Sequence, residues 1–150
     1  MIERILIVCD GNACRSPMAS AMLARALPFI QVRSAGLIAL AGRPAAQAAI
    51  DAMRARGFDL TPHIAQPVHL GHVRASQLIL AMTLVQCREI ERRYPFARGR
   101  VFQLDHATKR DIEDPVGKAA DVFDAVAAHI ERAVAQWIVR IPAAAAHGGA

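Results

Sequence analysis

Val8–Pro17, with the sequence VCDGNACRSP, is the stretch from which the rest of the fold can be worked out. The apolar run Ile5–Val8 leads into it and is typical of a strand buried in a parallel sheet. Met18–Arg25 follows it and has the composition of a helix. The pattern therefore predicts that Cys9 ends a strand and that Arg15, six residues later, begins a helix.

The predicted loop between this strand and this helix has the residues of an anion site. Gly11 and Asn12 are the types that adopt positive φ most readily, so the loop can turn backbone N–H groups inward. The N-terminus of the following helix adds its dipole to that field. Such a field favours the thiolate form of Cys9, and Arg15 can donate two hydrogen bonds to a phosphate. The loop therefore indicates a phosphate-binding site that contains a nucleophile.

Length and composition indicate one globular domain. The chain has 150 residues, 54% hydrophobic and 21% charged, and residues 1–141 are predicted to form the domain, with a flexible tail at 142–150. No apolar stretch approaches the roughly 20 residues that span a bilayer, and the first is too short for a secretory signal, so we expect no membrane insertion. Three cysteines argue against a disulfide framework and favour the cytoplasm.

The formal net charge of +5 suits a nucleic acid, an anionic membrane surface or a phosphorylated substrate. No motif that reads a nucleic-acid groove is found, and most arginines are scattered among alanines. We therefore expect no nucleic-acid partner and interpret the densest arginine group as a solvated helix face. That group consists of Arg88, Arg92, Arg93, Arg98 and Arg100.

Strand-like and helix-like segments alternate along the chain, which predicts an α/β three-layer sandwich. Its four-stranded parallel sheet has helices on both faces, and ligands bind at the carboxyl ends of such strands. His69 and His72 are expected in an exposed turn. The predicted strands are 3–8, 31–35, 78–82 and 100–104, and the predicted helices are 16–27, 45–56, 83–94 and 119–140.

Val8–Pro17 resembles the active-site loop of the low-molecular-weight protein tyrosine phosphatases. The resemblance covers residues 3–140, and the length and residues 36–44 are most similar to the bacterial branch associated with exopolysaccharide and capsule production. It implies the same four-stranded fold and hydrolysis of phosphotyrosine through a phosphocysteine. The other matching segments are SAGL at 34–37, GFDL at 57–60, HIA at 63–65, LILAM at 78–82 and IEDP at 112–115.

The resemblance implies three catalytic residues. Cys9 would attack phosphorus, Arg15 would clamp two phosphate oxygens, and Asp114 would protonate the phenolate, which is a poor leaving group. Because Arg15 and backbone amides neutralise the phosphate, we expect neither a metal nor another cofactor. Three further carboxylates of the same loop are chemically possible acids, namely Asp105, Asp111 and Glu113.

The matching loop comprises Cys9, Asp10, Gly11, Asn12, Ala13, Cys14, Arg15 and Ser16. Ser16 is expected to stabilise the thiolate or to cap the helix, and both roles are compatible. By resemblance, His63 forms a rigid hydrogen-bond network with Asn12 and Ser16. Cys14 is either a packing residue or a redox partner that protects Cys9 through a reversible disulfide.

The substrate entrance departs from the family pattern. Asp10 stands where an aliphatic residue is usual, Ala13 replaces isoleucine or threonine, and Val116 replaces an aromatic residue beside the phenol ring. Gln66 stands where arginine is usual, and Leu40 is expected to supply part of the missing apolar wall. These changes predict slow or selective turnover of phosphotyrosine.

Two other functions use the same residues. An arsenate reductase also begins with a thiolate in an oxyanion loop but needs further cysteines, and this chain offers only Cys87, in a predicted helix. A phosphotyrosine-binding module would need neither a thiol nor an acid. For the phosphatase, the expected partner is a phosphotyrosine protein such as an autophosphorylating bacterial tyrosine kinase.

Overall fold

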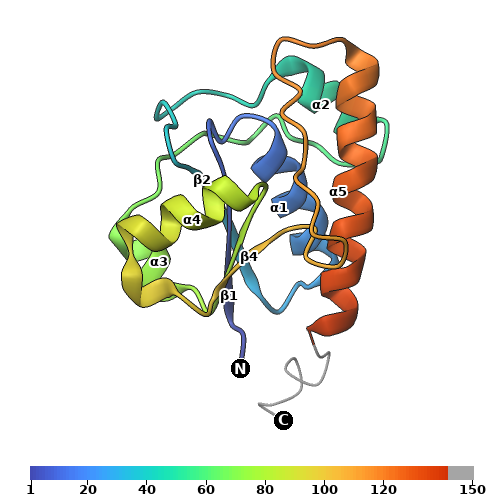
Figure 1. Cartoon of the computed structure of the whole chain (residues 1–150). Helices are drawn as coiled ribbons and strands as arrows, with labels where there is room; N and C mark the ends of the chain where they lie inside the picture. The colour runs from blue at the N-terminus through green and yellow to red at the C-terminus, as the bar shows by residue number, and fades with distance from the viewer. Residues whose placement is uncertain (142–150) are drawn as a thin grey trace.

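The computed structural model describes residues 1–141, which form four strands and five α-helices joined by loops (Figure 1). The strands are β1 (Arg4–Cys9), β2 (Gln31–Gly36), β3 (Leu78–Ala81) and β4 (Val101–Gln103). The helices are α1 (Arg15–Ala26), α2 (Gln47–Arg54), α3 (Leu70–Ala75), α4 (Leu84–Arg93) and α5 (Ala120–Arg140), with a short 3-10 helix η1 at Pro95–Ala97.

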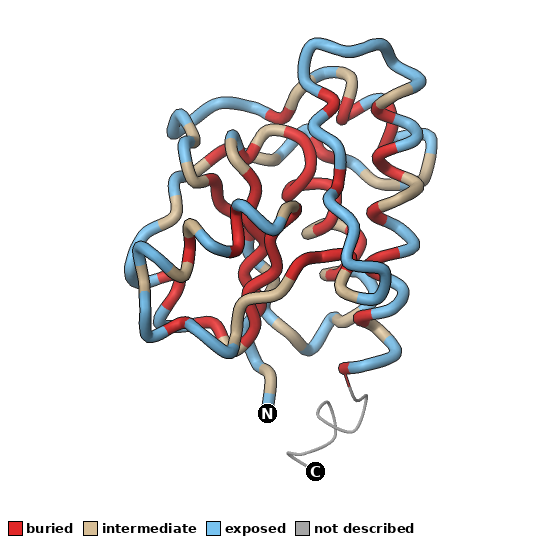
Figure 2. The backbone as a smooth tube through the Cα atoms, in the orientation of Figure 1, coloured by how far each residue is buried: buried red, intermediate tan, exposed pale blue. Residues whose placement is uncertain are grey.

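All strand pairs are parallel, and the order in the sheet is β2-β1-β3-β4. β1 is therefore central, and Cys9 at its carboxyl end pairs with Gly36 of β2. Five of its six residues are buried, as expected for a parallel sheet that is covered on both faces. Figure 2 shows this burial concentrated along the central strands.

Alternate residues of β1 belong to two separate cores. Ile5 and Ile7 lie in the larger core, to which α1, α2 and α5 contribute. Leu6 and Val8 lie in the smaller core with residues of α3 and α4. The sheet thus has helices on both faces (Figure 1), and the predicted three-layer α/β fold is confirmed.

The prediction of an exposed turn at His69 and His72 is wrong for His72, whereas His69 is exposed as predicted and precedes α3 as its N-cap residue. These residues lie at the start of α3, where His72 is only 7% exposed and its backbone N–H donates to Nδ1 of His69 at 3.3 Å. A helix of six residues has too few apolar positions to show a period. Val73 explains why it forms, because this side chain is fully buried in the smaller core.

The chain between α2 and α3 passes the carboxyl end of the edge strand β2 at Gly36, which pairs with the end of β1. Gln66 accepts a backbone hydrogen bond from Gly36, and Gly36 accepts one from Val68, each at 2.9 Å. An isolated antiparallel bridge joins Pro44 to Ile64. This segment therefore places residues far apart in the sequence beside the loop after β1.

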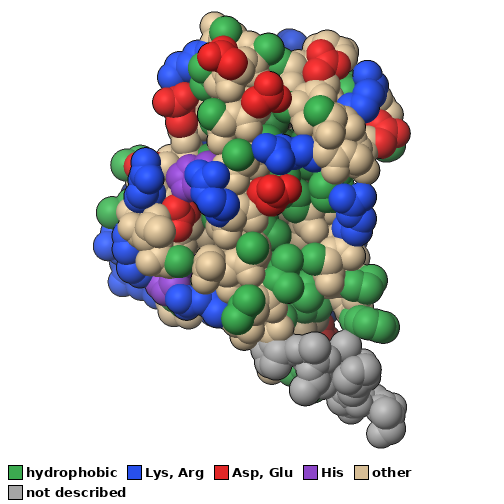
Figure 3. Space-filling view, turned by 90° about the vertical axis from the view of Figure 1, so that its right-hand side faces the viewer, with side chains coloured by type: hydrophobic (Ala, Val, Ile, Leu, Met, Phe, Trp, Pro, Cys, Tyr) green, Lys and Arg blue, Asp and Glu red, His purple; other side chains and the backbone are tan. Residues whose placement is uncertain are grey.

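The face formed by α5 carries acidic and basic side chains side by side in its upper part (Figure 3). Within the described residues, no helix is long and apolar enough to cross a membrane. The predicted tail at 142–150 lies outside the described residues.

Candidate active site

The loop between β1 and α1 has the strand–loop–helix arrangement that the sequence indicates. Asn12 has φ of 55°, in the left-handed region that asparagine tolerates better than most residues. Gly36 on β2 is required by close approach, because a Cβ there would lie 2.5 Å from the carbonyl oxygen of Asp10 and 3.0 Å from the backbone nitrogen of Asn12. The loop therefore curls tightly against the end of the edge strand.

The Cys9 thiol lies at the base of this loop and is 2% exposed. Its Sγ atom is 2.9 Å from Oγ of Ser16 and accepts a hydrogen bond from the backbone N–H of Asn12 at 3.2 Å. Asn12 Nδ2 donates to the Ser16 hydroxyl at 2.8 Å, which leaves the hydroxyl proton free for the sulfur. Two donors therefore face Cys9 Sγ, as a thiolate requires.

The helix-capping role expected for Ser16 is wrong. Helix α1 begins at Arg15, so its N-cap residue is Cys14, which forms no side-chain capping bond. Ser16 lies inside the first turn, fully buried, and its hydroxyl is engaged with Cys9 and Asn12. Pro17 occupies the first turn, as its sequence position predicts.

Asn12 joins the loop to β2 and to the chain between α2 and α3. Its side-chain NH₂ also donates to the Ser34 hydroxyl at 3.0 Å, and its Oδ1 accepts from the backbone N–H of Gln66 at 2.9 Å. His63 Nε2 lies 2.6 Å from the Asn12 carbonyl oxygen, so that ring nitrogen carries the proton. The structure thus brings Asn12, Ser16 and His63 together. Sequence reasoning missed Ser34, although it lies in the quoted SAGL segment.

Arg15 is 3% exposed, and its guanidinium lies between two carboxylates. One NH₂ nitrogen is 3.7 Å from both Asp10 Oδ2 and Asp114 Oδ2, and the other donates to the Ile112 carbonyl at 3.0 Å. Its Nε atom is buried and has no partner among the described residues. An oxyanion above the loop would satisfy this donor, since buried N–H groups are normally hydrogen-bonded.

Two of the four loop carboxylates serve the fold. Asp105 is buried and accepts hydrogen bonds from His129 at 2.7 Å and from the Thr108 hydroxyl at 2.6 Å. Burial acts against ionisation, but these hydrogen bonds outweigh it and hold the pKa of Asp105 below its usual value. Asp111 accepts from Gln103 at 2.9 Å and also from a backbone amide of α4.

The other two carboxylates are exposed, and only one of them reaches the arginine. Glu113 lies 3.6 Å from Lys118. Asp114 keeps 51% of its side chain exposed, with Oδ2 near Arg15 and Oδ1 accepting from the Val116 backbone at 3.1 Å. Of the four, Asp114 therefore has the position from which a carboxyl group can reach a leaving group above the loop.

The four residues expected at the entrance differ in their surroundings. Asp10 is held on one side by Gln86, whose Nε2 donates to Oδ1 at 3.0 Å, a partner that the sequence did not suggest. Ala13 is half-buried, while Leu40 and Val116 expose 62% and 60% of their surface. Of the residues predicted to line the entrance, Asp10 is thus held by a hydrogen bond, and Leu40 and Val116 have exposed apolar side chains.

Cys14 and Cys9 are both free and buried thiols. Burial, and then the neighbouring Cys9, raise the pKa of Cys14 to about 11. Cys14 is therefore a neutral thiol near pH 7, and its pairing with Cys9 on oxidation stays a prediction. Cys87 is buried in α4, as its predicted packing role requires.

No group of three or more His, Cys, Asp or Glu side chains that could hold a metal ion occurs in residues 1–141. His69 and His72 stack with ring centroids 3.6 Å apart and an interplanar angle of 22°. Their spacing in the sequence therefore reflects ring packing at the start of α3.

What the loop can hold defines the class of the protein. Its donors suit a tetrahedral oxyanion directly above a thiol, and the Asp114 carboxyl group lies beside Arg15, an arrangement that fits a cysteine-dependent phosphatase. The profile of the low molecular weight phosphotyrosine protein phosphatases matches residues 4–146, and the chain belongs to this family. The resemblance inferred from the sequence is thereby confirmed, and the chain is a phosphatase.

Known relatives agree over nearly the whole chain. A probable low molecular weight protein-tyrosine-phosphatase, EpsP of Ralstonia solanacearum, is 45% identical over 95% of this chain and 99% of its own. The tyrosine phosphatase AmsI of Erwinia amylovora has a TM-score of 0.90 at 35% identity, covering 93% of each chain. The arginine phosphatase YwlE of Geobacillus stearothermophilus has a TM-score of 0.88 at 33% identity, covering 93% of this chain and 92% of that one.

Proposed function

We propose that this protein hydrolyses phosphotyrosine in proteins and that Cys9 is the nucleophile. The observation that carries this proposal is the position of the thiol, which faces two hydrogen-bond donors at the base of a loop. Arg15 and Asp114 stand together at the same loop, 3.7 Å apart. A nucleophile, an anion clamp and an acid are thus within reach of one phosphate group.

The proposed reaction has two displacements at phosphorus. In the first, Cys9 Sγ forms a bond to phosphorus, the P–O bond to the phenol breaks, and Asp114 gives its proton to the departing oxygen. In the second, Asp114 takes a proton from water, whose oxygen attacks phosphorus and releases the thiolate. In both steps Arg15 donates to the equatorial oxygens, while the backbone N–H groups of residues 10–15 bind the remaining charge.

A bacterial tyrosine kinase is the proposed substrate protein. The kinase is proposed from the sequence resemblance to the exopolysaccharide-associated branch. Similarity to EpsP and to Wzb, a low molecular weight protein-tyrosine-phosphatase of Salmonella typhimurium that is 38% identical, supports the coarser proposal of a phosphotyrosine protein. We assign the chain to the exopolysaccharide-associated branch on the sequence resemblance at residues 36–44. A cytoplasmic location suits the three free thiols of the described chain.

Substrate preference tests the proposal directly. We expect hydrolysis of phosphotyrosine peptides to exceed that of matched phosphoserine peptides by at least about 100-fold in kcat/KM, because Leu40 and Val116 offer exposed apolar side chains to a phenol ring and phenolate is the better leaving group. Chelators should leave the rate unchanged. The measurement is the rate of phosphate release from each peptide, with and without a chelator. Equal rates on both peptides would overturn the proposed substrate class.

Phosphoarginine is a second candidate substrate, and Asp10 is the observation that favours it. Its carboxylate lies at the entrance, 47% exposed and held by Gln86. A negative charge there repels a phosphate but attracts the guanidinium of phosphoarginine. The similar structure of an arginine phosphatase supports testing this substrate on the same scaffold.

Replacing Asp10 with asparagine should move the two activities in opposite directions. Asparagine keeps an acceptor for Gln86 but removes the charge, so kcat/KM for phosphotyrosine should rise about two- to fivefold and that for phosphoarginine should fall. Asp124→Asn, at an exposed position of α5, controls for the change in net charge. A fall on both substrates would mean that Asp10 acts by holding Arg15.

A further inference from the structure

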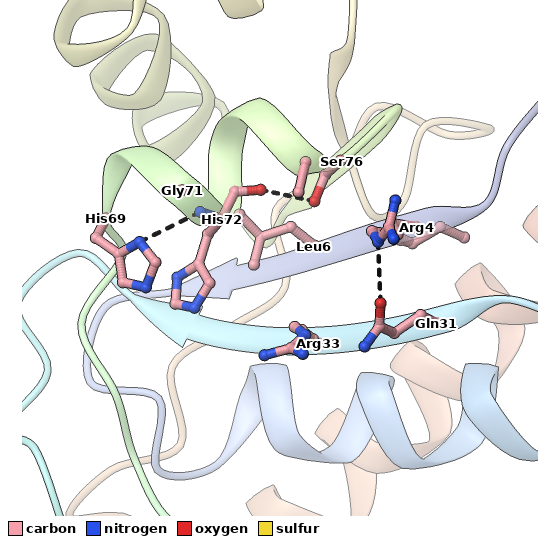
Figure 4. Close-up of a pocket in the computed structure, with 10 residues that line it drawn as sticks. Arg4, Leu6, Gln31, Arg33, His69, Gly71, His72 and Ser76 are labelled. Carbon is pink, nitrogen blue, oxygen red and sulfur yellow. Dashed lines mark hydrogen bonds between the residues drawn. The ribbon is translucent and has the colours of Figure 1, made fainter.

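A pocket of about 200 Å³ lies between α3 and the first halves of β1 and β2. It is separate from the loop after β1, because no residue of positions 9–16 lines it and Leu6, its lining residue nearest to Cys9 on β1, is three residues away, roughly 10 Å along an extended strand. No acidic residue lines it. Its polar lining, drawn in Figure 4, consists of Arg4, Gln31, Arg33, His69, His72 and Ser76.

The two arginines that line this pocket lack an acidic partner among the described residues. Neither Arg4 nor Arg33 has a carboxylate within 4.0 Å among the described residues. Arg4 is oriented through its Nε, which donates to Gln31 Oε1 at 3.0 Å. Both arginines are exposed enough to meet a ligand. The two guanidinium charges at this pocket are therefore not neutralised by a carboxylate of the described residues.

His72 adds a buried ring without a partner. Its ring descends from α3 toward the strand that carries Arg33 (Figure 4), and the residue is 7% exposed. Nδ1 is fully buried and has no hydrogen-bond partner in the described structure. Buried polar atoms of side chains are normally satisfied, so the ring of His72 forms a polar wall of the pocket that the described structure leaves without a hydrogen bond.

His69 is fixed beside His72 with a defined proton position. Its Nδ1 accepts the backbone N–H of His72 at 3.3 Å, so the neutral ring carries its proton on Nε2, where it can donate. Gly71 allows this packing, because a Cβ there would lie 3.0 Å from Cε1 of His69. The stacked pair thus presents a second donor beside the arginines.

The charges around His72 oppose its protonation. Burial, followed by His69 and Arg33, lowers the pKa of His72. A bound anion would act in the opposite direction, because its negative charge favours the protonated form of the His72 ring and attracts Arg33.

We propose that this pocket is a second oxyanion site, distinct from the catalytic loop, which binds the phosphate group of inorganic phosphate or of a small phosphate ester. The two arginines supply charge, and His69 supplies a donor through Nε2. The volume exceeds that of a single oxyanion, and Gly71 and Ala75 of α3 line part of the remainder. The organic part of a small ester would occupy this volume beside the exposed Ala75.

The histidine ring signals report on this pocket separately from the catalytic loop. NMR signals of the Cε1–H groups of His69 and His72, assigned with His→Gln variants, are followed as phosphate is added. We expect saturable shifts of both signals. Arg33→Gln should weaken the apparent affinity by about tenfold, since one charge-assisted contact is lost, and Arg74→Gln on α3, outside the pocket lining, should leave it unchanged.

Propylphosphonate, which is not hydrolysed, distinguishes the two kinds of ligand. If it binds the pocket more tightly than inorganic phosphate does, the ligand is a phosphate ester. If the two affinities are equal, the ligand is the free phosphate ion. Three results would overturn the site: no saturable shift, the same shift with sodium chloride at equal ionic strength, or wild-type affinity in folded Arg33→Gln. Arg4→Gln replaces that variant if Arg33→Gln does not fold.

Discussion

Replacing Cys9 with serine is expected to lower the turnover of phosphotyrosine by roughly 10⁴-fold or more, because the covalent route is removed. Serine has nearly the same shape and suits a buried position that already faces Ser16 and the Asn12 amide. Its hydroxyl remains protonated near pH 7 and is a far weaker nucleophile than a thiolate. The fold and the binding of phosphate at the loop should therefore persist while the reaction stops.

The measurement combines steady-state turnover with a search for the intermediate. After acid quenching, the wild-type protein mixed with an aryl phosphate should carry a covalent phosphate, and Cys9→Ser should not. Cys87→Ser is the control, because this buried cysteine packs in the smaller core, on the other face of the sheet. Undiminished turnover by Cys9→Ser would exclude Cys9 as the nucleophile.

The same experiment separates the other functions considered for this chain. A phosphotyrosine-binding module would bind the peptide and form no phosphocysteine. An arsenate reductase would pass electrons to further cysteines, but burial and then Glu91 raise the pKa of Cys87 to about 11. That thiol is therefore protonated near pH 7 and packs on the face of the sheet opposite to Cys9.

Much of the fold could be predicted because its strands are short apolar runs with clear boundaries. Ile5–Val8 and Leu78–Met82 predict buried parallel strands, and the alternation with helices predicts the layers. Helix α3 could not be predicted, since its single buried apolar side chain, Val73, gives no period. Its stability comes from the smaller core, which exists only once the sheet has formed.

The residues of the site that lie in one segment of the sequence could be predicted. The contacts between residues far apart in the sequence could not. Cys9, Asn12 and Arg15 lie within seven residues, between a predicted strand and a predicted helix, so this local pattern indicates an anion loop. The contact between Gln86 and Asp10 joins residues 76 positions apart, and no local sequence pattern predicts it. For the same reason, tertiary hydrogen bonds were needed to assign Asp105 to the fold.

Replacing Asp114 with asparagine is expected to lower kcat for phosphotyrosine by about 10²- to 10³-fold, within the range that general acids contribute. Asparagine has almost the same size and can still accept the Val116 amide, so the loop should keep its conformation. It cannot give a proton to the phenolate or take one from water. Glu113→Gln is the matched control, because this neighbouring exposed carboxylate contacts Lys118 and not Arg15.

The leaving group distinguishes an acid from a residue that only positions Arg15. With an aryl phosphate whose phenol is strongly acidic, the first displacement needs no proton, so Asp114→Asn should show little loss in the burst that forms phosphocysteine. The loss should grow as the phenol becomes less acidic. If Asp114 acted only by holding the guanidinium at 3.7 Å, every substrate would suffer alike, because all of them present the same phosphate to Arg15. An equal loss of rate in Asp114→Asn across the series of aryl phosphates would therefore show that another group is the acid.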